Sequence, residues 1–262
     1  MIRYAVLGSG SNGNSYIIES NGAAILLDAG FSLRQIRQRC EVSGFDPSRI
    51  IALFITHLHP DHARGAGVFA RQMKRPVFFH HRIQEEIREF RNLRIPDGLH
   101  RPMGIQDVSM GPFTVSSFAT HHDSPHSQGL RVRVGGRTFV LLTDTGKVSD
   151  DMAVHASESD VLFLEANYDE SMLANGPYPY YLKRRISGDE GHLSNEVSID
   201  FLNTLTHNDG RDVYFCHLSL ENNSPEVLRA SLEQKWRYPG SYTICENGKI
   251  YSGHKSPKEE TV

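Results

Sequence analysis

The stretch of sequence that decides the fold is residues 57–62, which run His57-Leu58-His59-Pro60-Asp61-His62. They follow the apolar run 50–55, which predicts a buried strand that ends at this loop. Imidazole and carboxylate groups are ligands suited to zinc, manganese or iron. These side chains would repel one another, or stay half-satisfied, if they were buried without a cation. The alternative is a solvated polar loop, but the density of ligand groups favours a metal site.

Three further polar side chains stand at the ends of predicted strands. They are Asp28 after residues 23–27, Asp144 after 138–142 and His217 after 213–216. Asp144 and His217 would open onto the same sheet edge as His57. Side chains delivered by separate, rigid elements are how a scaffold assembles a precise site.

Short apolar runs alternate with amphipathic stretches along the chain, a pattern typical of sheets flanked by helices. We predict strands over residues 2–7, 15–19, 23–27, 50–55, 76–79, 113–118, 130–134, 138–142, 161–164, 213–216, 242–244 and 249–251. We predict helices over residues 33–40, 63–73, 83–90, 195–205 and 226–236. This is enough strand for two sheets in a single α/β domain, residues 1–254, followed by a polar tail, residues 255–262.

Local signals mark where several of these elements begin or turn. Ser32 can cap the predicted helix 33–40, and either Ser194 or Asn195 can cap the predicted helix 195–205. Ser224 with Pro225 is a helix start. The pair 247–248, Asn-Gly, predicts a hairpin turn between the last two strands.

The composition bounds the class of protein. Hydrophobic residues make up 39% and charged residues 23% of the 262 residues, as in soluble globular proteins. A formal net charge of −3 argues against a wholly basic nucleic-acid coat, although it allows a local basic groove. Three scattered cysteines suit a reducing cytosol, and the N-terminus lacks the apolar core of a signal peptide. We therefore expect a cytoplasmic protein that is not membrane-bound.

The glycine-rich stretch 8–13, Gly-Ser-Gly-Ser-Asn-Gly, matches the dinucleotide-binding fingerprint letter for letter. That motif needs a helix after the turn, so that the helix N-terminus meets the pyrophosphate. Residues 15–19 instead predict a strand. We therefore interpret the stretch as a hairpin loop, placed to rim an active site.

Five motifs together resemble the metallo-β-lactamase-fold superfamily, whose signature is His-x-His-x-Asp-His after a strand with an Asp at an earlier strand end. Beside residues 57–62 they are residues 8–14, 141–146 (Leu-Leu-Thr-Asp-Thr-Gly), 191–195 (Gly-His-Leu-Ser-Asn) and 217–223 (His-Leu-Ser-Leu-Glu-Asn-Asn). The combination is most similar to the YycJ (WalJ) branch, although Tyr168 stands where that branch usually carries His. The resemblance implies a four-layer αββα sandwich of two mixed β-sheets flanked by helices. It also implies 5′-to-3′ exonuclease activity on DNA with two divalent ions, zinc or manganese, with iron a further option.

The resemblance also implies a ligand set. The first metal ion would be held by His57, His59 and His122, the second by Asp61, His62 and His217, and Asp144 would bridge them. The third histidine is open, because His121 and His126 lie in the same short stretch. We choose His122 because the related branch has a His-Asp pair here and Asp123 follows His122.

Two cations close together can lower the pKa of a bridging water and stabilise the oxygens of a phosphodiester, so that a bridging hydroxide attacks phosphorus. Asp61 would orient this water, and Asp28 would hold a ligand imidazole. His192 would neutralise charge on the phosphate or protonate the leaving group. The alternative for His192 is a structural role at a helix start.

The stretch 178–185 combines three tyrosines with Lys183-Arg184-Arg185 and predicts either a nucleic-acid contact surface or a solvated helix face. His80 and His81 are interpreted as ordinary strand-end or helix-cap histidines.

Other functions are compatible with the same ligands. One is a hydrolase of small phosphodiesters or thioesters, since the fold alone does not decide the chemistry. Another is a non-hydrolytic diiron metal-binding protein, against which stands the lack of a Cys-x-x-Cys pair for an electron-donor iron. The sequence does not indicate an oligomeric state.

Overall fold

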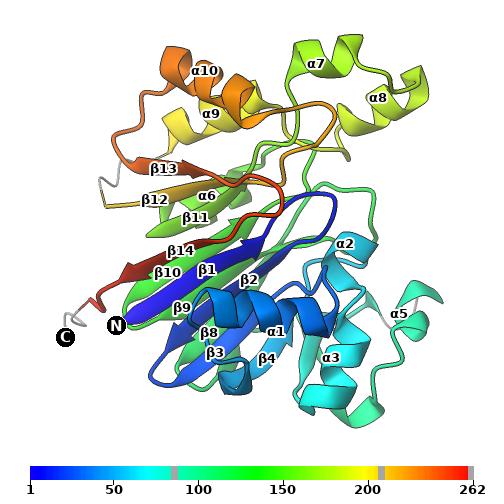
Figure 1. The fold of residues 1–262 in the computed structure, drawn as a ribbon, viewed down its shortest axis with the longest axis vertical. Helices are drawn as coiled ribbons and strands as arrows, with labels where there is room; N and C mark the ends of the chain where they lie inside the picture. The colour runs from blue at the N-terminus through cyan, green and yellow to red at the C-terminus, as the bar shows by residue number, and fades with distance from the viewer. Residues whose placement is uncertain (84–87, 206–209, 259–262) are drawn as a thin grey trace.

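Two seven-stranded sheets face each other in the computed structural model, which describes residues 1–83, 88–205 and 210–258 (Figure 1). The first sheet has the order β14 (Tyr251–Lys255), β1 (Ile2–Gly8), β2 (Ser15–Ser20), β3 (Ala23–Leu27), β4 (Ile50–Phe54), β5 (Val77–His80) and β6 (His100–Met103). The second has the order β13 (Ser241–Ile244), β12 (Asp212–Cys216), β11 (Val161–Glu165), β10 (Arg137–Leu142), β9 (Gln128–Val134), β8 (Phe113–Ala119) and β7 (Val108–Met110).

Helices cover the outer face of each sheet (Figure 1). On the first sheet lie α1 (Leu33–Val42) and α3 (Ala66–Met73), with the short α2 (Pro60–Ala63) and α5 (Arg88–Asn92) nearby. On the second lie α6 (Asp150–Ser157), α9 (Asn195–Thr204) and α10 (Pro225–Lys235). Two more helices, α7 (Glu170–Asn175) and α8 (Tyr180–Ile186), project beyond the second sheet, and two 3₁₀ turns occupy Pro47–Arg49 and Asp97–Leu99. The predicted sandwich of two mixed sheets with flanking helices is confirmed.

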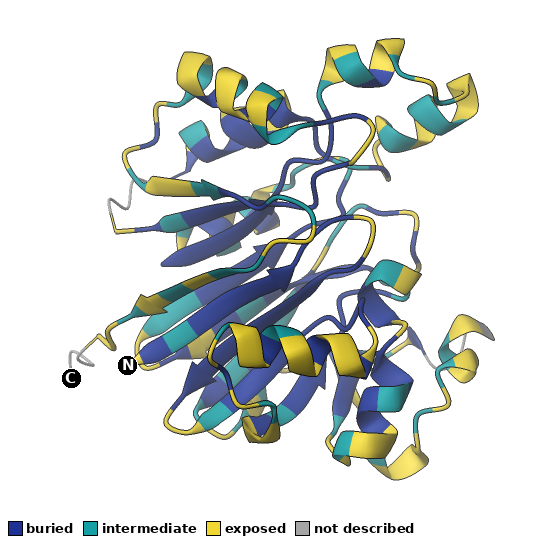
Figure 2. Ribbon diagram, in the orientation of Figure 1, coloured by how far each residue is buried: buried dark blue, intermediate teal, exposed yellow. Residues whose placement is uncertain are grey.

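Three hydrophobic clusters hold the four layers together. One lies between the sheets, and the other two lie between each sheet and its helices. Side chains alternate along each strand, so Ile18 packs between the sheets while Ile17 packs under the helices. Because both faces of these strands are buried, they are continuous apolar runs. Figure 2 shows the result as dark blue strands inside helices whose outer faces are yellow.

The helix starts follow from local capping. Ser32 caps α1, and Gln35 completes a capping box with it. Ser194, rather than Asn195, caps α9 through the amide of Val197. Ser224 caps α10 with Pro225 in the first turn, as predicted.

The predicted hairpin at residues 247–248 is wrong. Strand β13 pairs with β12 in the second sheet, whereas β14 pairs with β1 in the first. The Asn-Gly turn therefore carries the chain from one sheet to the other. The last strand also runs on to Lys255, which pairs with Ile2, and so it extends past the predicted boundary at residue 254.

Other differences are smaller. The predicted helix 63–73 is divided into α2 and α3, and β6 and β7 were not predicted from the sequence. Part of the predicted helix 83–90 lies outside the described residues. Among the described helices, none is both long and apolar enough to cross a membrane.

The strand directions determine where functional side chains can gather. Strands β3, β4 and β5 are parallel to one another, as are β10, β11 and β12. The carboxyl ends of parallel strands meet at one edge of a sheet, which is where ligands bind in open α/β sheets.

Candidate metal centre and active site

The predicted site residues stand at the carboxyl ends of strands from both sheets. Asp28 directly follows β3, and His217 directly follows β12. Asp144 lies two residues after β10. All three have left-handed backbone conformations, with φ of 58°, 58° and 59° respectively. Non-glycine residues rarely adopt this conformation, and those that do are concentrated at functional sites.

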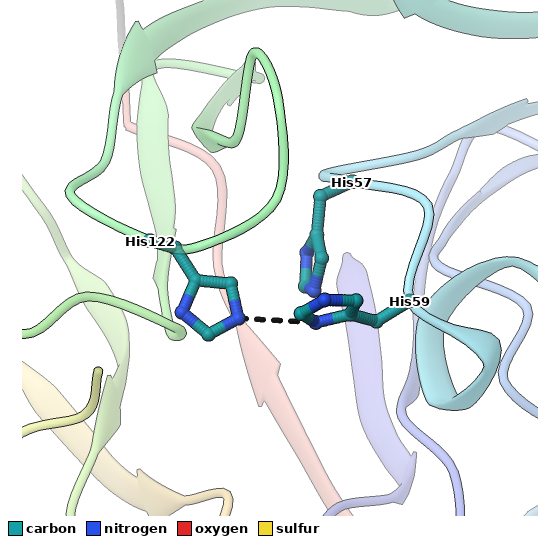
Figure 3. A group of neighbouring side chains, drawn as sticks. All are labelled: His57, His59 and His122. Atoms are coloured by element: carbon teal, nitrogen blue, oxygen red, sulfur yellow. Dashed lines mark hydrogen bonds between the residues drawn. The ribbon is translucent and has the colours of Figure 1, made fainter. Parts of the chain in front are cut away.

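The first group of candidate ligands is His57, His59 and His122, whose imidazoles point toward one another (Figure 3). One ring nitrogen from each lies within 4.8 Å of the others. The Nδ1 of His59 is 3.1 Å from the Nε2 of His122, the contact drawn as a dashed line. The Nδ1 of His122 donates to the carbonyl oxygen of Gly191 at 3.0 Å, which leaves its Nε2 free of a proton when the ring is neutral.

The second group is Asp61, His62 and His217, with ligand atoms that also lie within 4.8 Å of one another. The carboxylate Oδ2 of Asp61 is 3.3 Å from Nε2 of His217 and 3.5 Å from Nε2 of His62. Two segments far apart in sequence, one with Asp61 and His62 and the other with His217, thus present three ligand atoms to a common point.

Asp144 lies between the two groups. Its carboxylate is 3.2 Å from Nε2 of His62, 3.4 Å from Nε2 of His217 and 3.9 Å from Nε2 of His122. This position is compatible with the bridging role that the resemblance implies.

Two buried ligand atoms test whether this set of residues fits metal ions. Nε2 of His57 and Oδ2 of Asp144 are inaccessible to solvent and make no hydrogen bond among the described residues, although Oδ2 lies 3.2 Å from the ring nitrogen Nε2 of His62. A buried polar atom left without a partner destabilises the fold by about 1–3 kcal/mol. A cation would satisfy both atoms, and imidazole with carboxylate is the donor set that zinc and manganese accept. The residues therefore fit a pair of divalent ions.

Asp28 orients histidines in both groups. Its Oδ2 accepts a 2.7 Å hydrogen bond from Nδ1 of His62, and both residues are fully buried. The hydroxyl of Thr56 lies 3.0 Å from the same oxygen and 3.0 Å from Nδ1 of His57. If Thr56 donates to Asp28, it accepts from His57, and Nε2 of each histidine is then available as a ligand. The contact expected of Asp28 is therefore present.

Charge around the site favours a cation. Burial opposes protonation of His62, but the carboxylates of Asp144, Asp28 and Asp61 outweigh it and raise its pKa to about 9. Burial and the neighbouring imidazoles lower the pKa of His57 well below its usual value, so that ring is neutral and can donate its lone pair.

Glu165 is a functional residue that the sequence analysis missed. It ends β11, is fully buried, and its Oε1 lies 2.7 Å from Nδ1 of His192 and 3.3 Å from Nδ1 of His217. His192 and His217 together hold the pKa of this carboxyl well below its usual range against the effect of burial. The signal that could have revealed it is an acidic residue at the end of an otherwise apolar strand.

The other histidines of the 120–126 stretch lie elsewhere. The backbone of His121 is hydrogen-bonded to Thr145 and Gly146. The ring of His126 stacks on the ring of His80, with 4.8 Å between the ring centres. Within the described part of the chain, His122 alone of the three joins a candidate metal-binding group.

Asp123 was also missed as a site residue. Its Oδ1 is 3.6 Å from Nε2 of His59 and 3.5 Å from Nε2 of His122, and its other oxygen is bonded to Arg185 of α8. This links the helix to the ligand loop.

The glycine-rich loop does rim the site, as predicted. Strand β2 follows it, so the dinucleotide-binding context is absent. Asn14 places its amide nitrogen 3.0 Å from Nε2 of His62 and 3.3 Å from a carboxylate oxygen of Asp61. A pocket of about 210 Å³ opens over the site, and its walls include Ser11 of this loop and Arg185.

These observations define a class of protein. The chain matches the family model described as "Metallo-beta-lactamase superfamily" over residues 8–217, and it belongs to that superfamily of metallohydrolases. It is 34% identical over 233 residues to exodeoxyribonuclease WalJ of Streptococcus pneumoniae serotype 2, which covers 88% of this chain and 86% of that protein. It is 31% identical over 234 residues to exodeoxyribonuclease YycJ of Bacillus anthracis, covering 89% and 88% respectively.

Among solved structures, the metallo-β-lactamase-fold protein YhfI from Bacillus subtilis superposes with a TM-score of 0.69. The match has 20% sequence identity and covers 96% of this chain and 99% of that one. At this identity, the likeness is one of fold.

The packing of the glycine-rich loop against the site can be tested at Gly30. A Cβ at this position would lie 1.7 Å from the carbonyl oxygen of Asp61 and 2.5 Å from the amide of Asn14. We expect Gly30→Ala to destabilise the protein by about 1–3 kcal/mol and to weaken metal binding, because the backbone of Asp61 and Asn14 must move away from the added methyl group. Urea denaturation and metal titration measure the two effects. Gly98→Ala is the matched control, since nothing lies near its added methyl. Equal stability of the two variants would contradict this packing.

Asp28→Asn tests the orienting role. An amide has only one acceptor oxygen, so it cannot accept hydrogen bonds from both the Thr56 amide and Nδ1 of His62 as the carboxylate does, and the histidines lose their fixed tautomers. We expect metal affinity to fall by about 10- to 100-fold, measured by competition with a chelator. Asp200→Asn, an exposed position on α9, should bind metal as the wild type does. Unchanged affinity in Asp28→Asn would show that the contact does not support the ligands.

Proposed function

We propose that this chain is a two-metal phosphodiesterase that degrades DNA from the 5′ end. The observation that carries the proposal is the pairing of two ligand groups through Asp144 beside the His192–Glu165 pair, under an open pocket. Two relatives above 30% identity that are named exodeoxyribonucleases support the choice of DNA.

The two ions would be held by the residues named from the sequence. These are His57, His59 and His122 for one ion, Asp61, His62 and His217 for the other, and Asp144 between them. Zinc or manganese suits these ligands, and iron is a further option. Such a pair of ions, when bound, lowers the pKa of water toward neutrality and stabilises negative charge on the oxygens of a phosphodiester.

Asp61 and Asp28 contribute to the attack on phosphorus. Oδ2 of Asp61 faces the ring nitrogens of His62 and His217, and this carboxylate would orient the attacking water as well as bind an ion. Asp28 acts through the imidazole of His62, which it holds in one orientation.

His192 is placed to move a proton at the leaving group. Its Nδ1 faces the buried carboxylate of Glu165 at 2.7 Å, and its side chain is 20% exposed at the pocket wall. The carboxylate that accepts from Nδ1 fixes the orientation of the ring, and Nε2 is then the atom that would hold the proton passed to the departing oxygen. Ser194 caps the helix that begins just beyond His192, so the structural interpretation of this segment also holds.

The nuclease proposal is tested on two substrates. Purified protein supplied with manganese or zinc should release the label of 5′-labelled double-stranded DNA in small products and also cleave a small chromogenic phosphodiester. Asp144→Ala should abolish both activities and reduce metal uptake, because it removes the group shared by both sites. Asp200→Asn serves as the carboxylate control.

Each failure has a distinct meaning. Cleavage of the small diester alone would replace the nuclease with a small-molecule phosphodiesterase. Inactivity on both substrates would contradict the phosphodiesterase proposal and favour thioester hydrolysis or diiron redox chemistry. An optical spectrum of protein purified without air would detect a diiron centre.

His192→Gln separates proton transfer from metal binding. We expect kcat on DNA to fall by about 10²- to 10⁴-fold while the metal content stays at the wild-type value. The fall should be smaller on a diester whose leaving group is already acidic, since that group needs no proton. An equal loss on both diesters would show that His192 does not donate this proton.

A further inference from the structure

Helix α8 presents two neighbouring tyrosines to solvent. Tyr180 is 75% exposed and Tyr181 is 74% exposed, and no residue of the helix is buried. Figure 2 shows α8 in the colours of exposed and intermediate residues, projecting from the molecule. Large rings left in solvent on a surface helix do not contribute to the core, so they need another explanation.

The helix is part of the active-site wall. Leu182, Arg185 and Ile186 line the same pocket as the candidate metal ligands, and Arg185 is bonded to Asp123 of the ligand loop. Tyr181 and Arg185 are four positions apart, so they lie on the same face of the helix. Tyr181 is therefore on the same side of α8 as Arg185, next to the residues that line the pocket.

Positive charge accompanies the rings. Residues 183–185 are Lys-Arg-Arg, and the sequence of α8 contains no acidic residue, in a chain whose net charge is −3. The guanidinium of Arg184 lies 6.0 Å from the centre of the Tyr180 ring. Lysine and arginine close to exposed aromatic rings are the features that bind the phosphates and bases of single strands.

We propose that α8 is a stacking platform for the unpaired bases of a DNA strand that leads into the active site. This inference rests on the proposed nuclease function and adds a preference for single-stranded ends. Bases would stack on Tyr180 and Tyr181, and Arg184 would contact the backbone phosphates. A blunt duplex gains less from these rings, because its bases are already stacked on one another.

Binding is measured with a fluorescein-labelled, hydrolysis-resistant phosphorothioate oligonucleotide, single-stranded or as a blunt duplex, in the presence of manganese. The double variant Tyr180→Ala with Tyr181→Ala should bind the single strand at least about tenfold more weakly. The ring-preserving pair Tyr180→Phe with Tyr181→Phe should bind as the wild type does. Turnover of the small chromogenic diester should be unchanged in both, since neither tyrosine contacts the ligands.

The outcomes separate this inference from the nuclease proposal. Tight binding of the single strand that depends on the rings, without cleavage, would support the platform and contradict the nuclease. Unchanged binding by the alanine pair would overturn the platform even if DNA is cleaved. An equal loss by the phenylalanine pair, or an equal loss of duplex binding, would overturn stacking on single strands and indicate a different partner for α8.

Discussion

The buried carboxylate of Asp28 is the constraint on which the rest of the site depends. It holds His62 directly and His57 through the hydroxyl of Thr56, so one anion orients a ligand in each of the two groups. A carboxylate this deep in the protein is stable only with several hydrogen bonds, and β3, β4 and α2 must meet to supply them. The chain reaches this arrangement only if Asp28 adopts a left-handed conformation at the strand end. Local backbone strain thus accompanies precise placement of the ligands.

The two sheets convert this local constraint into a shared site. Parallel strands bring their carboxyl ends to one edge in each sheet, and the apolar layer between the sheets fixes the two edges against each other. Asp144 comes from the second sheet and faces His62, which follows β4 of the first sheet. Glu165 faces His217 at the end of β12, the neighbouring strand of its own sheet. The scaffold is common to the superfamily and supports several chemistries, so substrate choice lies in the parts that surround the ligands. In this chain, residues of α8 line the pocket over the ligands, and we propose that this helix contributes to that choice.

Much of the fold could be predicted because both faces of the central strands are buried, which makes each a recognisable apolar run. The candidate ligands of residues 57–62 could be predicted because they lie together within six consecutive residues. The contacts of Glu165 with His217 and of Asp123 with His59 could not be predicted, because they join segments far apart in sequence. The prediction of a hairpin at residues 247–248 was wrong because a turn signal gives no information about which sheet the next strand joins. The sequence pattern thus predicts helices and strands better than it predicts which of them pair or contact one another.

We propose that two groups of ligands, joined by Asp144, each hold one divalent ion. Crystals of the protein loaded with zinc or manganese would locate the ions by anomalous diffraction. We expect two anomalous peaks per chain, one among His57, His59 and His122 and the other among Asp61, His62 and His217. A single peak, or peaks away from both groups, would contradict it.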